Sequence, residues 1–463
     1  MSVVVLPNVP ESGQHLLRWS NQLTALDRRR LANDLGELDW SLIERLSHLS
    51  RLPTPEIASA EPAKSIVTLR DQAAPGGLSE RARRCGEELL GSGRVGAILV
   101  AGGQAARLGI AQPKGTLPFG PVTRRSLFQW HCEQLAERSR RAGVAIPYLI
   151  MTSETTHVAT VSFFGEHEFF GLPEHDVYFF QQGSLPTLDV ATGRPFLTDK
   201  HRIARSPDGH GGLLSALTRH RLWEMLAERG IEHLYYHQVD NPAAIVCDPL
   251  FLGLHWLQQA DVSTKVVEKC AATERMGVVA QVAGKTQIVE YTELSHTAAA
   301  AQTPACGGES ARLQFWAGNT AIHVFRRAFL QQLTQSGVEL PYHVVRRPVP
   351  YLDEQGECVI PQAANAFKFE QFLFDVLPYT ERTLIMETAR SREFLPIKEA
   401  TGDNSPASSG HGLMQLWRGW LRAAGVTIDS KVRVEISPAF ALEEADLYLR
   451  SLPPKVANDC VFE

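Results

Sequence analysis

The stretch AILVAGGQAARLGIAQPKG, which starts at Ala97, holds the residues with the clearest chemistry in this chain. Its apolar beginning is typical of a buried parallel strand, which Gly102 and Gly103 then break. Glycines permit a sharp turn and let a ligand approach the backbone with no Cβ in the way. Arg107 and Lys114 follow within reach of that turn. Backbone N–H donors and two cations suit a triphosphate, so the stretch predicts a nucleotide-using enzyme.

This glycine turn differs from the two best-known nucleotide-binding loops. A dinucleotide fold has GxGxxG where this chain has GGQAARLG, and a Walker loop has Ser or Thr after its lysine, where Gly115 follows Lys114. A plain tight turn explains Gly102 and Gly103 but not the cations after them. The phosphate-binding interpretation is therefore favoured over a structural turn.

The composition bounds the class of protein. With 463 residues, 44% hydrophobic and 21% charged, the chain is expected to form two or three ordinary soluble domains. The net charge of −5 argues against a general nucleic-acid binder. The 7 cysteines are scattered without a CxxC pair, which indicates neither a disulfide framework nor a zinc site and favours the reducing cytoplasm. No apolar run reaches the roughly 20 residues that span a bilayer, so no membrane partner is expected. The oligomeric state stays open.

The elements that must position these residues alternate along the chain. Apolar positions at helical spacing predict N-terminal helices over 15–50. The prolines and paired glycines of 51–78 predict a linker there. Beyond this, helices are expected at 79–90, 127–141, 213–229 and 413–424, strands at 147–152, 175–180 and 233–239, antiparallel strands within 264–293 and a mobile loop at 295–311. Such alternation favours a mostly parallel sheet covered by helices on both faces.

The motif AGGQ-x-x-RLG-x-x-x-PKG resembles the nucleotide-binding signature of the UDP-N-acetylglucosamine pyrophosphorylases, within the larger uridylyltransferase family. Ten further segments are similar to that family and follow its order: FFQQGSLPTLD, SPDGHGGL, VDN, KVVEK, MGVV, IVEYTEL, WAGNTAIHVF, FKFEQFLFD, EFLPIKEATGDN and EISP. The N-terminal helices agree only loosely with the family, and the C-terminal tail is shorter than in its eukaryotic members.

The resemblance implies a reversible reaction of UTP and N-acetylglucosamine 1-phosphate that gives UDP-N-acetylglucosamine and pyrophosphate. The sugar-phosphate oxygen would attack the α-phosphorus in line, assisted by Mg²⁺ and without a covalent enzyme intermediate. The expected fold is α/β: a central doubly wound, mostly parallel nucleotidyltransferase (Rossmann-like) sheet. We expect this catalytic domain over 93–395, a helical N-terminal domain over 1–92 and a small α+β C-terminal domain over 396–463.

Two kinds of alternative stay open. The sugar could be that of UDP-glucose, UDP-galactose or UDP-N-acetylgalactosamine, or the chain could be a UDP-sugar sensor without turnover. The sensor is disfavoured because Arg107, Lys114, Asp240 and Lys398 occur together, and a binder has no need of a pyrophosphate clamp.

Carried over residue by residue, the resemblance assigns the nucleotide loop first. Ala101, Gly102 and Gly103 match the segment that wraps the nucleotide. Arg107 is expected at the departing β- and γ-phosphates, and Lys114 supplies a second counter-charge.

Four downstream residues match the rest of the nucleotide site. Gln182 matches a glutamine that reads the uracil edge, for which an amide offers both a donor and an acceptor, and Gly209 matches a glycine beside the uracil ring. Lys398 matches a lysine on the diphosphate, where a cation stabilises the transition state. Asp240 ends the apolar strand LYYHQVDN, where parallel sheets bind their ligands, and matches the Mg²⁺-binding aspartate. No second metal ligand is evident.

The sugar pocket is implied by five more matches. Gly277, Glu290 and Asn319 would line it, with hydroxyl contacts from the last two. Phe372 and Phe374, at a spacing of two, could face one side of a strand near the sugar.

One residue of the sugar site departs from the family. Its members carry Asn in PDGNGG where this chain has His210. An imidazole differs from an amide in size and in its hydrogen-bond donors. This substitution therefore affects the predicted sugar preference and leaves the predicted reaction class unchanged. His323, within GNTAIH, is expected to be a core histidine rather than a base.

Overall fold

The computed structural model describes residues 5–53, 56–57, 59–105, 108–109, 112–303 and 311–463. The chain forms two compact units. The small unit comprises 1–55, 182–213 and 339–375, and the large unit comprises 56–181, 214–338 and 376–463. Each unit groups segments that lie far apart in the sequence, so it does not correspond to a continuous range. The three domain ranges predicted from the sequence therefore stay a prediction.

An 11-stranded mixed sheet forms the centre of the large unit. Its main path is β2 (Ile66–Val67), β22 (Thr383–Glu387), β12 (Val262–Glu268), β17 (Ala317–Arg326), β11 (His233–Gln238), β3 (Val95–Val100), β4 (Tyr148–Thr152) and β5 (Val177–Gln181). Alongside lie β1 (Glu61–Pro62), β13 (Val278–Val282) and β14 (Lys285–Val289). On the main path only β17 runs antiparallel to its neighbours, so the predicted mostly parallel α/β fold is confirmed.

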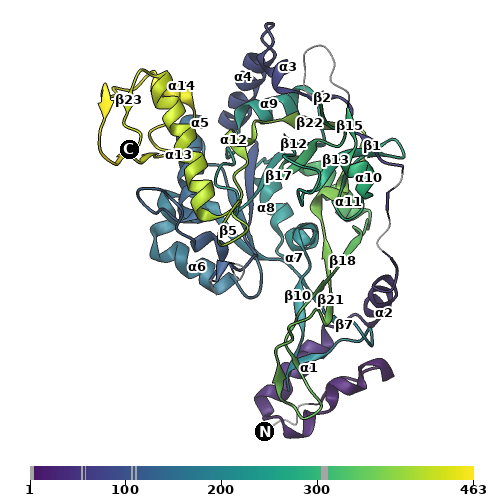
Figure 1. Ribbon diagram of the computed structural model, residues 1–463. Coiled ribbons are helices and arrows are strands. Elements are labelled where there is room, and N and C mark those ends of the chain that lie inside the picture. Colours follow the sequence, from purple (N-terminus) through teal and green to yellow (C-terminus); the bar gives the residue numbers. More distant parts are fainter. Residues whose placement is uncertain (1–4, 54–55, 58, 106–107, 110–111, 304–310) are drawn as a thin grey trace. The chain divides into compact units, whose positions relative to one another are not determined.

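Helices cover both faces of this sheet. The α-helices after the first two, which belong to the small unit, are α3 (Leu69–Ala73), α4 (Leu78–Gly91), α5 (Leu127–Ala142), α6 (His157–Glu166), α7 (Leu213–Arg219), α8 (Leu222–Glu228), α9 (Pro249–Leu257), α10 (His296–Ala300), α11 (Arg327–Gln335), α12 (Arg390–Glu393), α13 (Pro406–Ala423) and α14 (Glu444–Leu447). The apolar run of β3 is buried almost throughout, as expected for a parallel strand with two covered faces. Figure 1 shows α5 and α13 together beside the sheet, and their Trp130 and Trp417 rings lie 5.4 Å apart.

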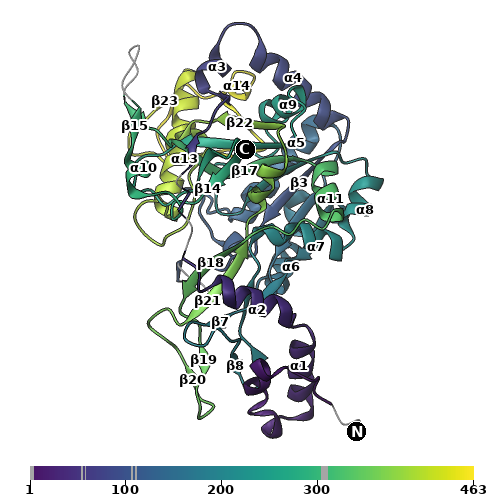
Figure 2. The ribbon, with the colours of Figure 1, turned by 90° about the vertical axis from the view of Figure 1, so that its right-hand side faces the viewer.

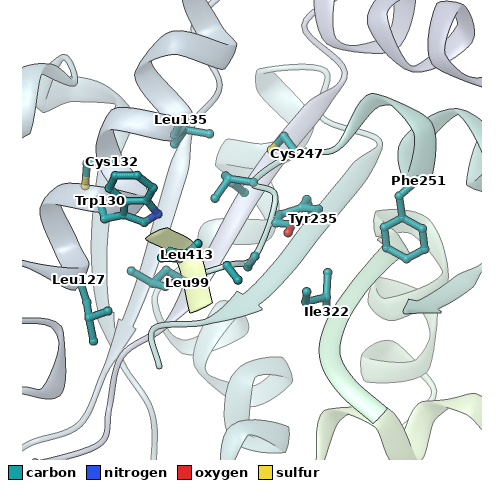
Figure 3. Close-up of a cluster of buried hydrophobic side chains, with 14 of the residues drawn as sticks. Leu99, Leu127, Trp130, Cys132, Leu135, Tyr235, Cys247, Phe251, Ile322 and Leu413 are labelled. Carbon is teal, nitrogen blue, oxygen red and sulfur yellow. The ribbon is translucent and has the colours of Figure 1, made fainter. Parts of the chain in front are cut away.

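The main hydrophobic core joins these helices to alternate residues of the strands. Figure 3 shows Leu99 of β3 and Tyr235 of β11 together with Leu135 of α5 and Leu413 of α13. The intervening residues Ile98 and Leu234 are also buried, on the opposite face. That face meets the end of α7, where the His220 ring lies 6.1 Å from Phe180 of β5.

The small unit combines helices α1 (Ala25–Gly36) and α2 (Trp40–Leu49) with short strands. Its three-stranded sheet is β18 (Tyr342–Arg347), β21 (Ala366–Gln371) and β7 (Leu188–Asp189) (Figure 2). Short antiparallel pairs join β6 (Ser184–Pro186) with β10 (Arg205–Pro207), β8 (Leu197–Asp199) with β9 (Arg202–Ile203), and β19 (Tyr351–Leu352) with β20 (Cys358–Val359). The helices bury Leu31 and Ile43 in one cluster with Phe369.

Four expectations about local structure were wrong. The linker expected over 51–78 contains β1 and β2, which pair in the central sheet, and helix α3. The helix expected over 213–229 is two helices, because Arg221 adopts a left-handed conformation with φ 56° between α7 and α8. The loop expected over 295–311 contains α10, capped by Ser295, and strand β15 (Gln302–Thr303), which pairs with β16 (Arg312–Leu313); 304–310 lie outside the described residues.

The fourth error concerns the two phenylalanines. Phe372 and Phe374 do not lie in a strand, because β21 ends at Gln371 and a 3-10 turn, Leu373–Tyr379, follows.

The C-terminal segment adds two small parallel pairs to the large unit. These are β23 (Thr427–Ile428) with β25 (Lys455–Val456), and β24 (Val434–Ile436) with β26 (Cys460–Phe462). Helix α13 starts at Pro406, earlier than predicted, behind a capping box on Ser405. Within the described ranges, no helix is long and apolar enough to cross a membrane.

Candidate active site

The predicted phosphate-binding residues lie at the carboxyl ends of adjacent parallel strands. In the β3–β11 ladder Val100 pairs with Gln238, so both strands end at the same edge. The N–H of Val239 donates to the carbonyl of Val100 at 3.1 Å, and that of Ala101 donates to Met151 at 2.8 Å. The segments that follow, with Gly102 and Asp240, therefore leave the sheet side by side. This is the edge where open α/β sheets bind ligands.

The glycine turn is held by hydrogen bonds to its carbonyls. The N–H of Lys114 donates to Gly103 O at 3.2 Å, and the hydroxyl of Ser153 donates to Gly102 O at 2.8 Å. A Cβ built on Gly103 would meet no atom within 4 Å among the residues that the structure describes. The fold itself therefore leaves room for a side chain there, and the open space is available to a ligand. Arg107 lies outside the described residues.

Lys114 and Asp240 form an ion pair at this edge. Lys114 Nζ donates to Asp240 Oδ2 at 3.2 Å, and each side chain is 16% exposed. Burial would raise the pKa of the Asp240 carboxyl, but the ammonium groups of Lys114 and Lys398 outweigh burial and lower it below its ordinary value. Asp240 is therefore an anion under the influence of two cations, and the two lysines can neutralise the charge of a bound phosphate.

Lys398 reaches this site from a segment that is bonded to the end of β11. The N–H of Ile397 donates to Asp240 O at 2.7 Å, and the N–H of Lys398 donates to Asn404 O at 2.6 Å. The exposed side chain of Lys398 leaves its charge available. The structure thus brings together Lys114, Asp240 and Lys398, as the sequence predicted.

The three large-unit residues predicted for the sugar pocket also lie together. Asn319 of β17 donates its N–H to Gly277 O at 2.9 Å, and a Cβ on Gly277 would lie 2.8 Å from Glu290 Oε1. The side-chain oxygen of Asn319 accepts from the N–H of Ala321 at 3.0 Å, where β17 bends with φ 58°. A bend in the strand and a glycine opposite it therefore bring a carboxylate and an amide to one place.

The uracil-reading residues predicted in the small unit are also neighbours. Gln182 Nε2 donates to Asp208 Oδ1 at 3.3 Å and to Gly209 O at 3.2 Å. Gly209 has φ 85°, and a Cβ there would lie 2.4 Å from Gln371 O, so the fold itself requires glycine at this position. Asp208 is buried and was missed by the sequence prediction, although it lies beside the glycine within SPDGHGG.

His210 is tied to the two predicted phenylalanines. Its Nδ1 accepts from the N–H of Leu373 at 3.0 Å, and its ring stacks on Phe372 at 5.2 Å between centroids. The Phe374 ring lies 5.4 Å away. Burial, and then the nearby His343, lower the pKa of His210 to about 3, so the imidazole is neutral at physiological pH. The residue that departs from the family thus contacts the phenylalanines of the predicted sugar site.

Asp240 could bind a magnesium ion only if substrate phosphates and waters supplied the other ligands. No group of three His, Cys, Asp or Glu side chains that could hold a metal occurs in the part of the chain that the structure describes. Mg²⁺ is commonly bound by one or two carboxylates together with substrate phosphates and waters. Asp240, which is ionised and lies at the ligand edge of the sheet, fits that mode.

The fold and this edge define the class of protein. A mostly parallel α/β sheet whose strand ends present a glycine turn, two lysines and a carboxylate is a nucleotide-binding fold of the nucleotidyltransferase type. The chain belongs to the UTP–glucose-1-phosphate uridylyltransferase family, whose family model matches residues 63–416.

Curated relatives and solved structures agree with this assignment. The chain is 36% identical over 364 residues to the UDP-N-acetylglucosamine pyrophosphorylase of Saccharomyces cerevisiae, covering 76% of this chain and 75% of the relative. It is 35% identical over 439 residues to the human UDP-N-acetylhexosamine pyrophosphorylase-like protein 1, covering 90% and 85%.

A solved structure extends the match to almost the whole chain. The uridine diphosphate N-acetylglucosamine pyrophosphorylase of Trypanosoma brucei superimposes with a TM-score of 0.79 at 25% identity, covering 99% of both chains. A UDP-glucose pyrophosphorylase of Leishmania major, at 14% identity and a TM-score of 0.61, shares the fold alone.

Proposed function

We propose that this protein transfers the uridylyl group of UTP to an N-acetylhexosamine 1-phosphate and releases pyrophosphate, with N-acetylglucosamine 1-phosphate as the preferred acceptor. The observation that carries the proposal is the cluster of Lys114, Asp240 and Lys398 at the strand ends. The names of the yeast and Trypanosoma brucei relatives support the choice of sugar. We also propose that the enzyme lies in the cytoplasm. The cysteines of the described ranges form no disulfides, which is typical of a reducing compartment.

In this mechanism an oxygen of the sugar phosphate attacks the α-phosphorus while the bond to the β-phosphate breaks. Pyrophosphate leaves with the bonding electrons. The attacking oxygen is already ionised near neutral pH, so no general base is needed. The chain contributes charge and position: Lys114 and Lys398 neutralise phosphate charge as it moves toward the leaving group. We propose that Asp240 holds Mg²⁺, which supplies further charge neutralisation on the phosphates when bound.

The remaining residues are proposed to select the two ligands. Gln182 and Gly209 would bind uracil, and Gly277, Glu290 and Asn319 would bind the sugar. His210, Phe372 and Phe374 are proposed to border the sugar's acyl group. These assignments rest on the family match at every position except His210, and on the neighbour relationships described within each unit.

The alternatives are a pyrophosphorylase for UDP-glucose, UDP-galactose or UDP-N-acetylgalactosamine, and a sensor that binds UDP-sugars without turnover. The test is pyrophosphate release from UTP and Mg²⁺ with the 1-phosphates of glucose, galactose and their two N-acetylamino derivatives. We expect the highest kcat/KM with N-acetylglucosamine 1-phosphate. A higher value with another sugar would establish that sugar as the substrate instead. Tight UDP-sugar binding without turnover in either direction would establish the sensor.

A further inference from the structure

A buried lysine beneath the proposed active site has no role in the mechanism above. Lys265 lies on β12 and its side chain is 0% exposed. Its Nζ contacts Asp248 Oδ2 at 2.7 Å and Glu393 Oε1 at 2.5 Å. Both carboxylates are almost fully buried as well. A buried ion pair often stabilises a fold no more than apolar side chains of similar volume would. A buried ion pair is therefore weak evidence of stabilisation, and what Glu393 holds in place decides its role.

Glu393 is fixed at both ends of its side chain and by its backbone. Its Oε2 accepts from the Thr388 hydroxyl at 2.8 Å, opposite the Oε1 that contacts Lys265. Its carbonyl accepts from Asn241 Nδ2 at 2.8 Å. Glu393 is the last residue of α12, and the segment that carries Lys398 follows directly.

Asn241 joins that segment to the end of β11. Its Oδ1 accepts from the N–H of Leu395 at 3.0 Å, while its Nδ2 donates to Glu393 O. The residue before it is Asp240, whose carbonyl accepts from Ile397 N at 2.7 Å. Three hydrogen bonds thus connect the Asp240 end of β11 to residues 393–397, and the Lys265 ion pair anchors residue 393.

We propose that the Lys265–Glu393 ion pair is a positioning device, which acts through Asn241 to hold Lys398 near Asp240 during uridylyl transfer. This inference rests on the proposed function. Without the anchor at Glu393 the segment that follows α12 is free to shift, and the Lys398 charge shifts with it. A displacement of about 1 Å of a charged group is enough to lower the rate by about 100-fold.

Asp248 supplies the matched control. It contacts the same buried lysine at a similar distance, but its Oδ1 caps α9 by accepting from Leu250 N at 3.0 Å. Asp248→Asn and Glu393→Gln therefore each remove one buried charge from Lys265, and only the second acts on the segment that carries Lys398.

The test is a double-mutant cycle on the full-length protein, measured as single-turnover rates with UTP and N-acetylglucosamine 1-phosphate. Glu393→Gln is expected to lower the rate about tenfold with an almost unchanged KM for UTP, and Asp248→Asn to change it less than about twofold. In the Lys398→Ala background, Glu393→Gln should cause no further loss. Equal losses for the two carboxylate variants, or additive losses in the cycle, overturn the positioning role and leave the proposed function standing.

A milder variant covers the case in which Glu393→Gln does not fold. Thr388→Val removes one hydrogen bond to Glu393 and leaves the charges in place. We expect a loss of about threefold that disappears in the Lys398→Ala background. A wild-type rate for Thr388→Val overturns the proposal. Wild-type protein inactive with every sugar 1-phosphate would overturn the proposed function and this inference together.

Discussion

Asp240 and Lys114 form an ion pair across 126 positions of the sequence, with 3.2 Å between Oδ2 and Nζ. Neither residue lies in a regular strand: one follows β11 and the other closes the turn after β3. They meet because those strands are parallel neighbours that end at one edge. The proposed chemistry therefore depends on a β-ladder more than on any local motif.

Gly103→Ala tests whether glycine is needed at this position for nucleotide binding rather than for folding. A Cβ at this position meets no atom of the described residues within 4 Å, so the urea midpoint should not fall. We expect the KM for UTP to rise about tenfold or more, because the added methyl occupies the space proposed for the nucleotide. Gly165→Ala in α6, where no atom of the described residues lies within 4 Å either, is the control: it should leave the KM for UTP unchanged, and the urea midpoint should rise slightly because alanine favours the helix. An unaltered KM in Gly103→Ala would place the nucleotide elsewhere.

Gly277→Ala tests the proposed sugar end. The added Cβ would lie 2.8 Å from Glu290 Oε1, so the flexible Glu290 side chain must move while the backbone is kept. The KM for the sugar 1-phosphate should rise about tenfold, with the KM for UTP unchanged. Gly419→Ala in α13, which meets nothing within 4 Å, is the matched control. If both KM values rise together, the residue does not act on the sugar alone.

His210→Asn tests whether this position sets the sugar preference. Asparagine can still accept from the N–H of Leu373 but loses the ring stacked on Phe372. We expect the kcat/KM ratio of N-acetylglucosamine 1-phosphate over glucose 1-phosphate to rise about tenfold.

The control for this substitution removes the other ring stacked on Phe372. His343 lies 4.2 Å from Phe372 between centroids, and His343→Asn loses that stack while leaving residue 210 in place. It should leave the substrate ratio unchanged. A ratio that stays constant in His210→Asn would exclude residue 210 as a determinant of specificity.

Buried histidines make the protein less stable in acid. Burial lowers the pKa of both His131 and His233 to about 4, below the ordinary value of about 6.5. The unfolded chain therefore binds more protons between these values, so stability is full above about pH 6.5 and is lost as the pH falls toward 4.

This acid sensitivity can be assigned to one side chain. Each such histidine contributes a slope of about 1.4 kcal/mol per pH unit. His131→Gln should reduce the slope of the unfolding free energy between pH 6.5 and 4.5, measured in urea, by about that amount. The exposed His175 is the control, and His175→Gln should leave the slope as it is. A wild-type slope in His131→Gln would exclude this histidine as a source of the acid sensitivity.

The sequence predicted the strands that carry the site because each is a short apolar run followed by polar residues. It also predicted that Lys114, Asp240 and Lys398 act together, since each lies in one of three separate segments that resemble the family. It could not predict the hydrogen bond from Ser153 to Gly102 or that from Asn241 to Glu393, which join segments 51 and 152 positions apart. Such bonds depend on how strands are ordered in the sheet, and no local pattern encodes that order.

Two of the wrong predictions, the single helix over 213–229 and the strand with Phe372 and Phe374, failed because of local turns that residue spacing does not reveal. The predicted helix over 213–229 has helical spacing throughout, but Arg221 turns left-handed and lets α8 start anew. Phe372 and Phe374 have strand spacing, yet the N–H of Gln371 donates to Asp208 O at 2.7 Å at the very end of β21. The chain turns after that bond: Phe372 follows the strand, Phe374 lies in the 3-10 helix Leu373–Tyr379, and the two rings lie 5.1 Å apart.

The most direct test of the central claim is the reverse reaction in wild type and Asp240→Asn. The first measurement is the rate at which labelled pyrophosphate and UDP-N-acetylglucosamine form labelled UTP in the presence of Mg²⁺. The second is the Kd of UDP-N-acetylglucosamine. We expect rapid label transfer by wild type and a loss of about 100-fold or more in Asp240→Asn, with UDP-sugar binding still measurable. Label transfer by Asp240→Asn at the wild-type rate would contradict the proposed role of this carboxylate.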